Sequence, residues 1–363
     1  MGMPVRALIV SASIGEGHDL PARILAAALE ARGAEAPIVD SLAEAGPAAS
    51  RLAGAATNYD TRLGNLLFDA GHRVVSEWRL TRRASARAVH ALGRRGLQAA
   101  VERVRPDVVV STYPGATESL GRLRLAGTLR VPVVSAITDL ASLRYWAHTG
   151  VDLHLLTHPE SEAEVRAIAG PSTRIVAVHG LTDPAFRHPP DRVVARGHLA
   201  LPAEGSMIVV SGGGWAVGDL EGAVTGAVGA GAGTVVILCG RRQDVRERLG
   251  ARFAAHPEVR VWGFTERMAD VLAAADVLVH STAGLTVLEA MASGCRTISY
   301  GWGRGHIRAN NRAYERFGLA EVATTRPELV TALRRALSAP RALPWQPELP
   351  EAADLVLGLA QTA

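Results

Sequence analysis

The chain has 363 residues and a formal net charge of +4, and all 39 of its basic residues are arginine. The absence of lysine excludes Schiff-base chemistry and a P-loop phosphate site, because both require that residue. Two cysteines, Cys239 and Cys295, cannot form a disulfide framework, which favours a reducing compartment. The length and the 48% hydrophobic fraction suit two domains with buried cores. The apolar run at the start is too short for a signal peptide or a membrane span, so we expect a cytoplasmic protein.

Positive charge is concentrated between Arg62 and Arg105, where ten arginines face three acidic residues. Apolar and aromatic side chains are interspersed among them. A basic amphipathic helix of this kind is typical of proteins that bind an anionic membrane surface. The candidate contact residues are Trp78, Arg79, Arg82 and Arg83. The alternative is a pair of solvated helices with an arginine face, and no recognised motif points to a nucleic-acid partner.

Short apolar runs alternate with helical segments along the chain, which predicts parallel α/β sheets. The expected strands of the first half are Val5–Val10, Ala36–Asp40, Asp107–Ser111, Val131–Ile137, Leu153–Thr157 and Arg174–Val178. Those of the second half are Met207–Ser211, Thr234–Cys239, Val259–Trp262, Val277–His280 and Arg296–Tyr300. A proline-rich linker at Asp183–Arg192 divides the chain into predicted domains 1–185 and 186–345. Residues 346–363 end as a helix that would pack across this linker.

The motif S-A-S-I-G-E-G-H follows the first expected strand and precedes a helix. Gly15 and Gly17 allow a ligand to approach the backbone closely, and a helix N-terminus favours negative charge. His18 lies at the mouth of this turn, where an imidazole can accept a proton at neutral pH. A capping histidine is the alternative. A dinucleotide-binding fingerprint would look similar, with Asp40 as the ribose-binding acid, but Leu20 replaces its third glycine.

The strongest pattern runs from Ala275 to Gly294, where an expected strand ends at His280 and S-T-A-G-L-T opens a helix. Free N–H groups at such a helix start suit a diphosphate without lysine or metal. The residues expected to hold it are Ser281, Thr282, Ala283, Gly284, Leu285 and Thr286. Glu289, in the same helix, is positioned to accept hydrogen bonds from a ribose diol. The alternative is an ordinary helix with a buried glutamate, which would need a partner.

Four other loops of the second half follow expected strands, so they lie at the same edge of the predicted sheet. The motif S-G-G-G-W supplies Gly213 and Gly214, and Arg241 follows the next strand. Phe264 lies on a loop where backbone atoms can read a flat base. The glycine-rich stretch G-W-G-R-G-H-I-R-A-N-N is interpreted as a loop with polar tips that include His306 and Asn310.

Taken together, these residues resemble the inverting GT-B glycosyltransferases of family 28. That family includes monogalactosyldiacylglycerol synthase, the processive diacylglycerol glucosyltransferases and the peptidoglycan N-acetylglucosaminyltransferase that acts on a polyprenyl diphosphate. The first half matches in G-E-G-H, in R-P-D-V-V-V-S-T-Y-P (Arg105–Pro114) and in V-P-V-V-S-A-I-T-D-L-A-S-L-R-Y-W (Val131–Trp146). The second half matches in A-D…S-T-A-G-L-T-V-L-E-A…G.

The resemblance implies a GT-B fold: two Rossmann-like parallel-sheet domains that face a central cleft. It implies an inverting, metal-independent transfer of sugar from a UDP-sugar to a hydroxyl of a lipid acceptor at the inner face of the cell membrane. No cofactor is expected, and no Asp-x-Asp metal motif occurs. His18 becomes the candidate base, and Asp139 of the Thr-Asp pair the second catalytic candidate. Phe264 would present its backbone to uracil, and Glu289 would hold the ribose.

The chain departs from the family pattern at two places. Leu143 stands where the diacylglycerol enzymes have a histidine, and His306 with Ile307 stands where they have Gln-Glu or Gln-Gln. Alternative functions are a nucleotide-sugar epimerase or hydrolase on the same fold, a dinucleotide-dependent oxidoreductase, and a non-catalytic sugar or lipid binder. The arginine-rich segment favours transfer to a lipid over the first of these.

Overall fold

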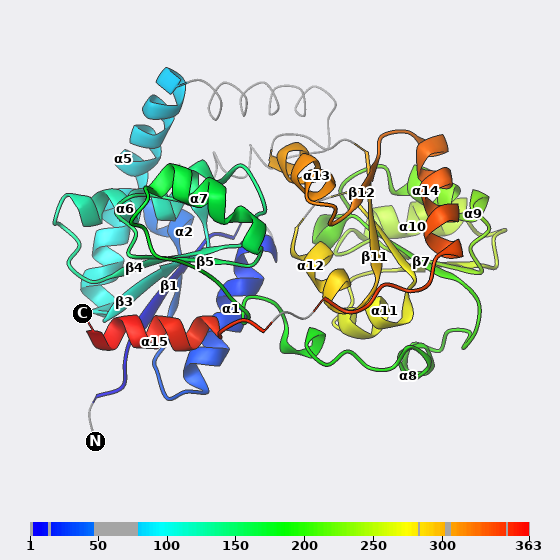
Figure 1. Cartoon of the computed structure of the whole chain (residues 1–363), viewed down its shortest axis with the longest axis horizontal. Helices are drawn as coiled ribbons and strands as arrows, with labels where there is room; N and C mark the ends of the chain where they lie inside the picture. The colour runs from blue at the N-terminus through cyan, green and yellow to red at the C-terminus, as the bar shows by residue number, and fades with distance from the viewer. Residues whose placement is uncertain are drawn as a thin grey trace. The chain divides into compact units, whose positions relative to one another are not determined.

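A computed structural model describes residues 3–13, 16–46, 79–281, 284–301, 306–345 and 348–362. The chain folds into two compact units (Figure 1). Unit 1 consists of residues 1–183 and 348–363, and unit 2 consists of residues 184–347. Each unit is built on its own parallel six-stranded sheet.

The sheet of unit 1 has the strand order β2-β1-β3-β4-β5-β6, and every pair is parallel. Its strands are β1 (Ala7–Ser11), β2 (Ile38–Asp40), β3 (Val108–Ser111), β4 (Val133–Ile137), β5 (Leu153–Leu156) and β6 (Ile175–Ala177). Its helices are α1 (Glu16–Glu30), α2 (Ser41–Ala45), α5 (Arg79–Val104), α6 (Pro114–Leu125), η1 (Leu143–Tyr145), η2 (Pro159–Ser161), α7 (Glu162–Ala169) and α15 (Ala352–Thr362).

Alternation along the strands of unit 1 sends apolar side chains to both faces of its sheet. Ile9 and Val110 pack with Leu25 of α1 and Val356 of α15 on one face. On the other face, a second buried cluster joins the sheet to α5 and α6. The chain returns from unit 2 to place α15 against α1 (Figure 1), so the two ends of the sequence complete one core.

The sheet of unit 2 has the order β12-β11-β10-β7-β8-β9, again with only parallel pairs. Its strands are β7 (Met207–Ser211), β8 (Thr234–Leu238), β9 (Val259–Trp262), β10 (Val277–His280), β11 (Arg296–Tyr300) and β12 (Glu321–Ala323). Its helices are η3 (Pro184–Phe186), α8 (Arg192–His198), η4 (Gly213–Trp215), α9 (Leu220–Gly229), α10 (Gln243–Arg252), α11 (Met268–Ala274), α12 (Leu285–Ala292), α13 (His306–Arg316) and α14 (Arg326–Ser338).

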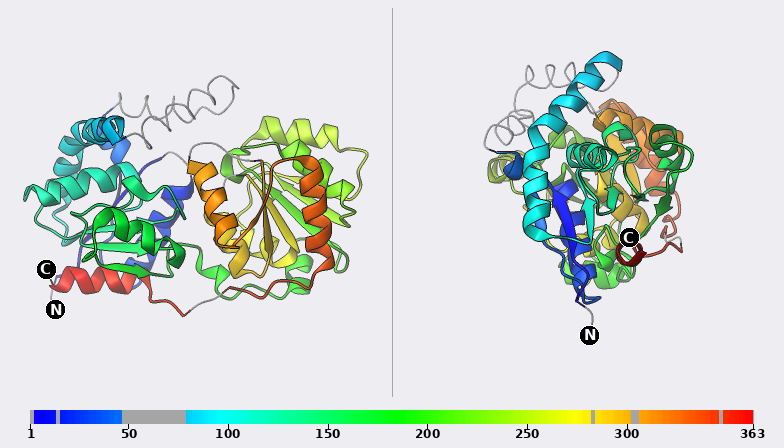
Figure 2. Two further views of the ribbon diagram at one scale, coloured as in Figure 1. Left: turned by 45° about the horizontal axis from the view of Figure 1, so that its top comes forward. Right: turned by 90° about the vertical axis from the view of Figure 1, so that its left-hand side faces the viewer.

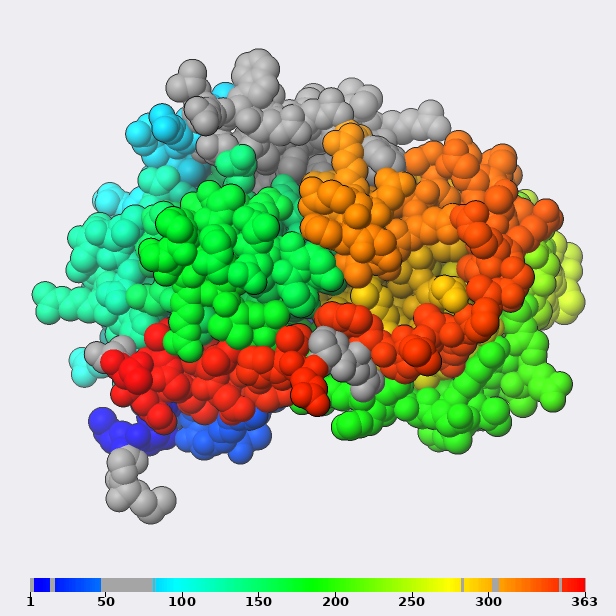
Figure 3. Space-filling view, viewed as in Figure 1, coloured from blue at the N-terminus to red at the C-terminus, as the bar shows by residue number. Residues whose placement is uncertain are grey.

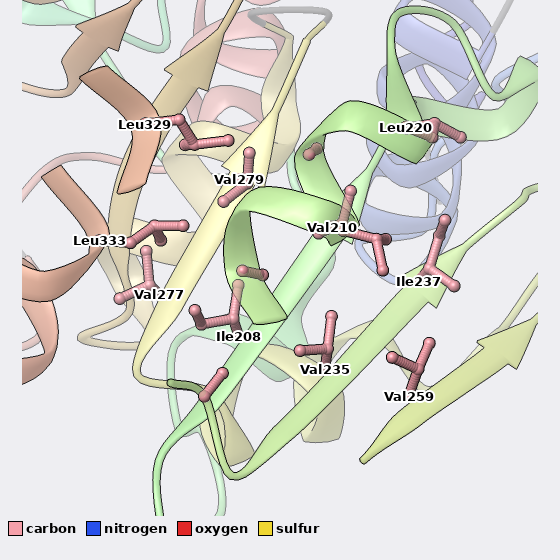
Figure 4. Packing of buried hydrophobic residues seen from close by; sticks show 14 of the residues in the cluster. Ile208, Val210, Leu220, Val235, Ile237, Val259, Val277, Val279, Leu329 and Leu333 are labelled. Carbon is pink, nitrogen blue, oxygen red and sulfur yellow. The ribbon is translucent and has the colours of Figure 1, made fainter. Parts of the chain in front are cut away.

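Figure 4 shows the core on one face of this second sheet. Ile208 and Val210 of β7 point with Val277 and Val279 of β10 toward Leu329 of α14, and all five are at most 1% exposed. The intervening strand residues face α8, α11 and α12 in a second buried cluster. Burial of each large aliphatic side chain contributes roughly 1.5–3 kcal/mol, so both faces hold the sheet in place.

All eleven strands expected from the sequence are present, with ends that differ by at most two residues. The expected set lacks β12, because Glu321–Ala323 is only three residues long and has no apolar run. The second difference concerns the stretch interpreted as a loop through Asn311. Helix α13 begins at His306, with Ile307, Asn310, Asn311 and Tyr314 buried at helical spacing.

Candidate functional site

His18 lies in the first turn of α1, just after the C-terminal end of β1. Its Nδ1 is 3.0 Å from the carbonyl oxygen of Thr112, the residue that follows β3. A carbonyl oxygen only accepts hydrogen bonds, so Nδ1 carries the proton in the neutral ring and Nε2 carries the lone pair. The backbone therefore selects the tautomer that a general base requires.

Two aromatic side chains flank the His18 imidazole. The ring of Tyr113 meets it edge-on with 5.3 Å between centroids, and the ring of Trp146 lies 5.7 Å away. Trp146 is 1% exposed and donates from Nε1 to Oδ2 of Asp139 over 2.8 Å. Gly17 is tied to the same region, because its carbonyl oxygen accepts from Oγ1 of Thr138 at 3.3 Å. Gly15 lies outside the described residues.

The structure thus brings His18 and Asp139 to one edge of the first sheet, at the C-terminal ends of β1, β3 and β4. His158, which follows β5, is fully buried close to Asp139. Burial lowers the pKa of His158 to about 4, although Asp139 opposes this shift. His158 is therefore neutral at physiological pH.

Asp40 does not have the open carboxylate of a ribose-binding acid. It is the N-cap of α2, where its side chain accepts from the backbone N–H groups of Leu42 and Ala43. The N–H of Ser13 donates to its other oxygen at 3.2 Å. These bonds stabilise the turns around β1 and weaken the dinucleotide alternative.

Four residues of unit 2 that were predicted to bind the UDP-sugar lie at the C-terminal ends of β7, β8 and β9. Gly213 and Gly214 form η4, and the N–H of Arg241 donates to the carbonyl oxygen of Gly214 over 2.8 Å. The Arg241 guanidinium lies 4.1 Å above the ring of Phe264. Phe264 is 47% exposed, so this stacked pair offers its surface to a ligand.

The motif that follows β10 is described in part. Ser281 donates from its hydroxyl to the carbonyl oxygen of Val217, which fixes one end of the loop, and Thr282 and Ala283 lie outside the described residues. Gly284 is the N-cap of α12 and makes no side-chain cap. Leu285 is buried in the first turn, and Thr286 is half-buried beside it. The first N–H groups of α12 are therefore not capped by its N-cap residue, as a diphosphate site requires.

The remaining residues predicted to bind the UDP-sugar lie on α12 and α13. Glu289 is 6% exposed in α12, and Asn310 is fully buried in α13. The neighbouring Asn311 accepts from the hydroxyl of Ser299 over 2.8 Å, which fastens α13 to β11. His306 begins α13, and its side chain lies outside the described part of the structure.

The basic segment is described from α5 onward, so Trp78 lies outside the description, as do the side chains of Arg79 and Arg82. Arg83 is exposed. The C-terminal half of α5 packs on the sheet through Leu97 and Ala100, and its N-terminal turns extend beyond the sheet (Figure 2). Among the described residues, no helix combines the length and apolarity that crossing a membrane needs, and no cluster of metal-ligating side chains occurs.

The sequence did not indicate two residues beside His18 in unit 1 or one close contact between loops in unit 2. Tyr113 and Trp146 stand in the fragments S-T-Y-P and R-Y-W, but nothing local in those fragments indicates that both rings meet His18. In unit 2, Gly218 has a φ of +102° and passes so close to Ser281 that a Cβ there would lie 2.6 Å from the serine Cβ. This glycine joins the η4 loop to the loop after β10.

Both units match known proteins in sequence. The family model for monogalactosyldiacylglycerol (MGDG) synthase matches residues 18–182, and the model for glycosyl transferases group 1 matches residues 223–338. The processive diacylglycerol β-glucosyltransferase of Bacillus thuringiensis is 22% identical over 87% of this chain and 81% of its own length. The enzyme of the same name from Bacillus subtilis is 22% identical over 68% of this chain and 65% of its own length. The two matched models thus describe glycosyltransferases, one within unit 1 and the other within unit 2.

Solved structures support the same fold. The crystal structure of Acinetobacter baumannii MurG has 17% identity and a TM-score of 0.57, and it covers 99% of this chain and 100% of that one. LpCGTa in complex with UDP has 16% identity and a TM-score of 0.56, covering 99% and 94% of the two chains. The predicted GT-B fold and family resemblance are confirmed, and the relatives named here do not support the epimerase or oxidoreductase alternatives.

Proposed function

We propose that this GT-B protein transfers a sugar from a UDP-sugar to a hydroxyl of a membrane lipid, with inversion at the anomeric carbon. The observation that carries the proposal is the setting of His18. Its tautomer is fixed by Thr112, and its ring lies between Tyr113 and Trp146 in the unit that matches the MGDG synthase model. An imidazole held in this way is suited to removing a proton from an acceptor hydroxyl.

The second sheet supplies the donor side of the proposal. Phe264 and Arg241 offer a stacked surface for the uracil ring, and the start of α12 offers backbone N–H groups and a helix dipole to the diphosphate. Glu289 is assigned to the ribose, and Gly213, Gly214, His306 and Asn310 complete the proposed donor set. The UDP complex of LpCGTa, which shares the fold, is consistent with this choice of nucleotide.

The chemical step follows from these assignments. Nε2 of His18 takes the proton from the acceptor hydroxyl as its oxygen attacks the anomeric carbon of the sugar. The bond from that carbon to the diphosphate breaks, and UDP leaves with both electrons of the bond. Dipoles at the start of α12 stabilise the charge on the leaving diphosphate, and one displacement inverts the anomeric centre.

Helix α5 is proposed to hold the protein at the inner face of the cell membrane. Arg83, Arg87, Arg94 and Arg95 are all exposed, and Leu92 among them is 52% exposed. Each arginine near an anionic surface contributes about 1 kcal/mol of binding, so these four side chains would contribute roughly 4 kcal/mol to reversible attachment. The diacylglycerol named in the Bacillus relatives is the acceptor class that such a surface would supply.

The direct test is a transfer assay with a panel of UDP-sugars and diacylglycerol in vesicles, with mass spectrometry of the lipid products and NMR assignment of the anomer. His18→Ala should lower the transfer rate roughly 10²–10⁴-fold. UDP affinity, measured by calorimetry, should not change. His256→Ala changes a histidine of unit 2 whose side chain is 39% exposed and which has no proposed catalytic role, and it is the matched control. Transfer by His18→Ala at the wild-type rate would exclude it as the base, and a retained anomeric configuration would exclude single displacement.

A further inference from the structure

A pocket of about 560 Å³ lies in unit 2 at the edge of the sheet opposite to the donor residues. Ser206 and Asp276, which immediately precede β7 and β10, line it. Arg192 of α8 and Arg341, which follows α14, also line it. A strand of five residues spans about 16 Å, so this pocket is separate from the groups that follow β7 and β10. We call it the arginine pocket and define it by Arg192, Ser206, Asp276 and Arg341.

The surface of unit 2 around the arginine pocket is formed by segments far apart in the sequence. Figure 3 shows the orange-red residues that follow α14 crossing this part of unit 2, with green residues from the start of the unit beside them. Val193, which is 59% exposed, and Leu337 give the pocket an apolar wall. The volume is within the usual range for sites that bind small molecules.

Asp276 is the carboxylate at the centre of this arrangement, and its hydrogen-bonding capacity is largely used. Its Oδ2 accepts from Nη2 of Arg192 and from the N–H of Met207, each over 2.8 Å. The buried Arg196 places its Nη2 3.6 Å from the same oxygen. One carboxylate is thus shared by two guanidinium groups.

Positive charge in this region exceeds the charge that Asp276 can balance. Arg196 is 1% exposed, and its pKa is lowered by burial and by the neighbouring Arg192 and Arg341, with Asp276 opposing. Among the described residues, Arg341 donates only to backbone carbonyl oxygens, those of Gly294, Leu272 and Ser293. Glu204 also lines the pocket, but it is exposed to solvent. Partly buried guanidinium groups with so little counter-charge favour an anion.

Donor groups are available on both arginines that line the pocket. Nη1 of Arg192 makes no hydrogen bond among the described residues, and the buried Nε of the same side chain has no acceptor there either. The bonds of Arg192 run through Nη2 alone, to Asp276 and to the carbonyl oxygen of Gly205. Arg341 bonds through Nε and Nη2, so within the described ranges its Nη1 has no acceptor. The planar fork of a guanidinium matches the oxygen spacing of a phosphate group.

We propose that the arginine pocket binds a phosphate-bearing anion through Arg192 and Arg341, with Asp276 fixing the orientation of Arg192. The recognised chemistry is a phosphate monoester or diester with an apolar neighbour against Val193 and Leu337. Two sources supply it: a soluble phosphate ester or the headgroup of a phospholipid. This site is independent of the transfer reaction, because no residue of it belongs to the proposed donor or base machinery.

The test uses the full chain with saturating UDP, which blocks phosphate binding at the donor site. Calorimetric titration with glycerol 3-phosphate measures the soluble arm. Co-sedimentation with phosphatidylglycerol vesicles, against phosphatidylcholine vesicles, measures the lipid arm. It uses a variant with Arg83, Arg87, Arg94 and Arg95 changed to Gln, which removes the four exposed arginines proposed to bind the membrane. Arg192→Gln and Arg341→Gln should each weaken binding roughly tenfold or more. The control Arg248→Gln changes an exposed arginine of the same unit that is paired with Glu221, and it should leave binding unchanged.

If glycerol 3-phosphate binds and both substitutions weaken that binding, the ligand is a soluble phosphate ester. If only the vesicles bind and both substitutions weaken that binding, the ligand is a phospholipid headgroup. Absence of both, or affinity that neither variant changes, overturns the proposal. Since Arg192 also ties α8 to the sheet, a readout that needs no variant is added. Crystals of the wild-type protein soaked in tungstate should show an anomalous peak between Arg192 and Arg341, and a structure without that peak contradicts the site.

Discussion

Trp146 donates its indole N–H to Oδ2 of Asp139 over 2.8 Å. The same indole lies beside the imidazole of His18, with 5.7 Å between ring centroids, and is almost completely buried. The carboxylate that accepts from the edge of the Trp146 ring therefore also limits the movement of the imidazole beside that ring. Under the proposed function, this relation favours a positioning role for Asp139, through Trp146, with His18 as the proposed base.

Replacement of Trp146 by Phe tests this relation, because it keeps an aromatic ring and removes the N–H donor. We expect the transfer rate to fall roughly tenfold, since a hydrogen bond to a charged group contributes about 1.5–3 kcal/mol and part of that loss appears as misplacement of His18. UDP affinity should not change.

Asp139→Asn separates positioning from proton transfer by Asp139 itself. The amide oxygen still accepts from the indole, but an amide cannot take a proton. Activity within about threefold of wild type is expected for a positioning role. A loss as large as that of His18→Ala, with a changed pH profile of the rate, would instead place Asp139 in the proton transfer.

Buried histidines make unit 1 sensitive to acid. Burial lowers the pKa values of His154 and His158 to about 4, from an ordinary value of 6.5. Between these values the unfolded chain binds protons that the folded chain does not, so stability is complete above pH 6.5 and falls as the pH drops toward 4. From pH 7 to pH 5 we expect a loss of roughly 2 kcal/mol for each histidine.

Urea unfolding at pH 7, 6 and 5 measures this loss. His158→Gln should reduce the change in the free energy of unfolding with pH. His256→Gln alters a histidine whose side chain is 39% exposed, and it should leave that change as it is in the wild type. A free energy of unfolding that is constant from pH 7 to pH 5 would contradict the assignment of neutral buried histidines.

The fold was largely predictable from the sequence because the strands of a parallel sheet are continuous apolar runs. Val108–Ser111 and Met207–Ser211 show such runs, and the loops that follow them carry the proposed chemistry. Contacts between loops were not predictable. The stacking of Arg241 on Phe264 arises because β8 pairs with β9, and the contact of Trp146 with His18 arises because β1, β3 and β4 are neighbours. Residue spacing along the chain does not indicate which strands pair.

The stacked pair of Arg241 and Phe264 predicts a selective defect in donor binding. Phe264→Leu keeps apolar volume but removes the ring face on which the guanidinium rests, 4.1 Å from the centroid. We expect the KM for the UDP-sugar to rise about fivefold to thirtyfold, because a cation–π contact and base stacking contribute roughly 1–2 kcal/mol.

A second stacked pair in the same unit is the matched control. The guanidinium of Arg252 lies 5.3 Å from the ring of Phe253, at the C-terminal end of α10 and away from the donor loops. Arg252→Gln should leave the KM for the donor unchanged, whereas Arg241→Gln should raise it. Equal effects of the two changes would show that the Arg241 pair acts only through stability.

Gly240 tests whether the η4 loop and the loop after β8 must touch for the donor to bind. Its φ is +55°, and a Cβ at this position would lie 2.3 Å from the carbonyl oxygen of Gly214, the same oxygen that accepts from the N–H of Arg241. Gly240→Ala therefore combines a left-handed backbone with a collision between backbone atoms, and it should destabilise the fold by roughly 1–3 kcal/mol. The loops must separate to relieve the collision, so the KM for the UDP-sugar should rise more than the rate falls.

Gly250→Ala, in α10, is the control. A Cβ at this position meets no atom within 4 Å, so the substitution should stabilise the fold slightly, by about 0.5–1 kcal/mol. Thermal unfolding and donor kinetics on the two variants measure both effects, and an unchanged KM in Gly240→Ala would show that the donor does not depend on this contact.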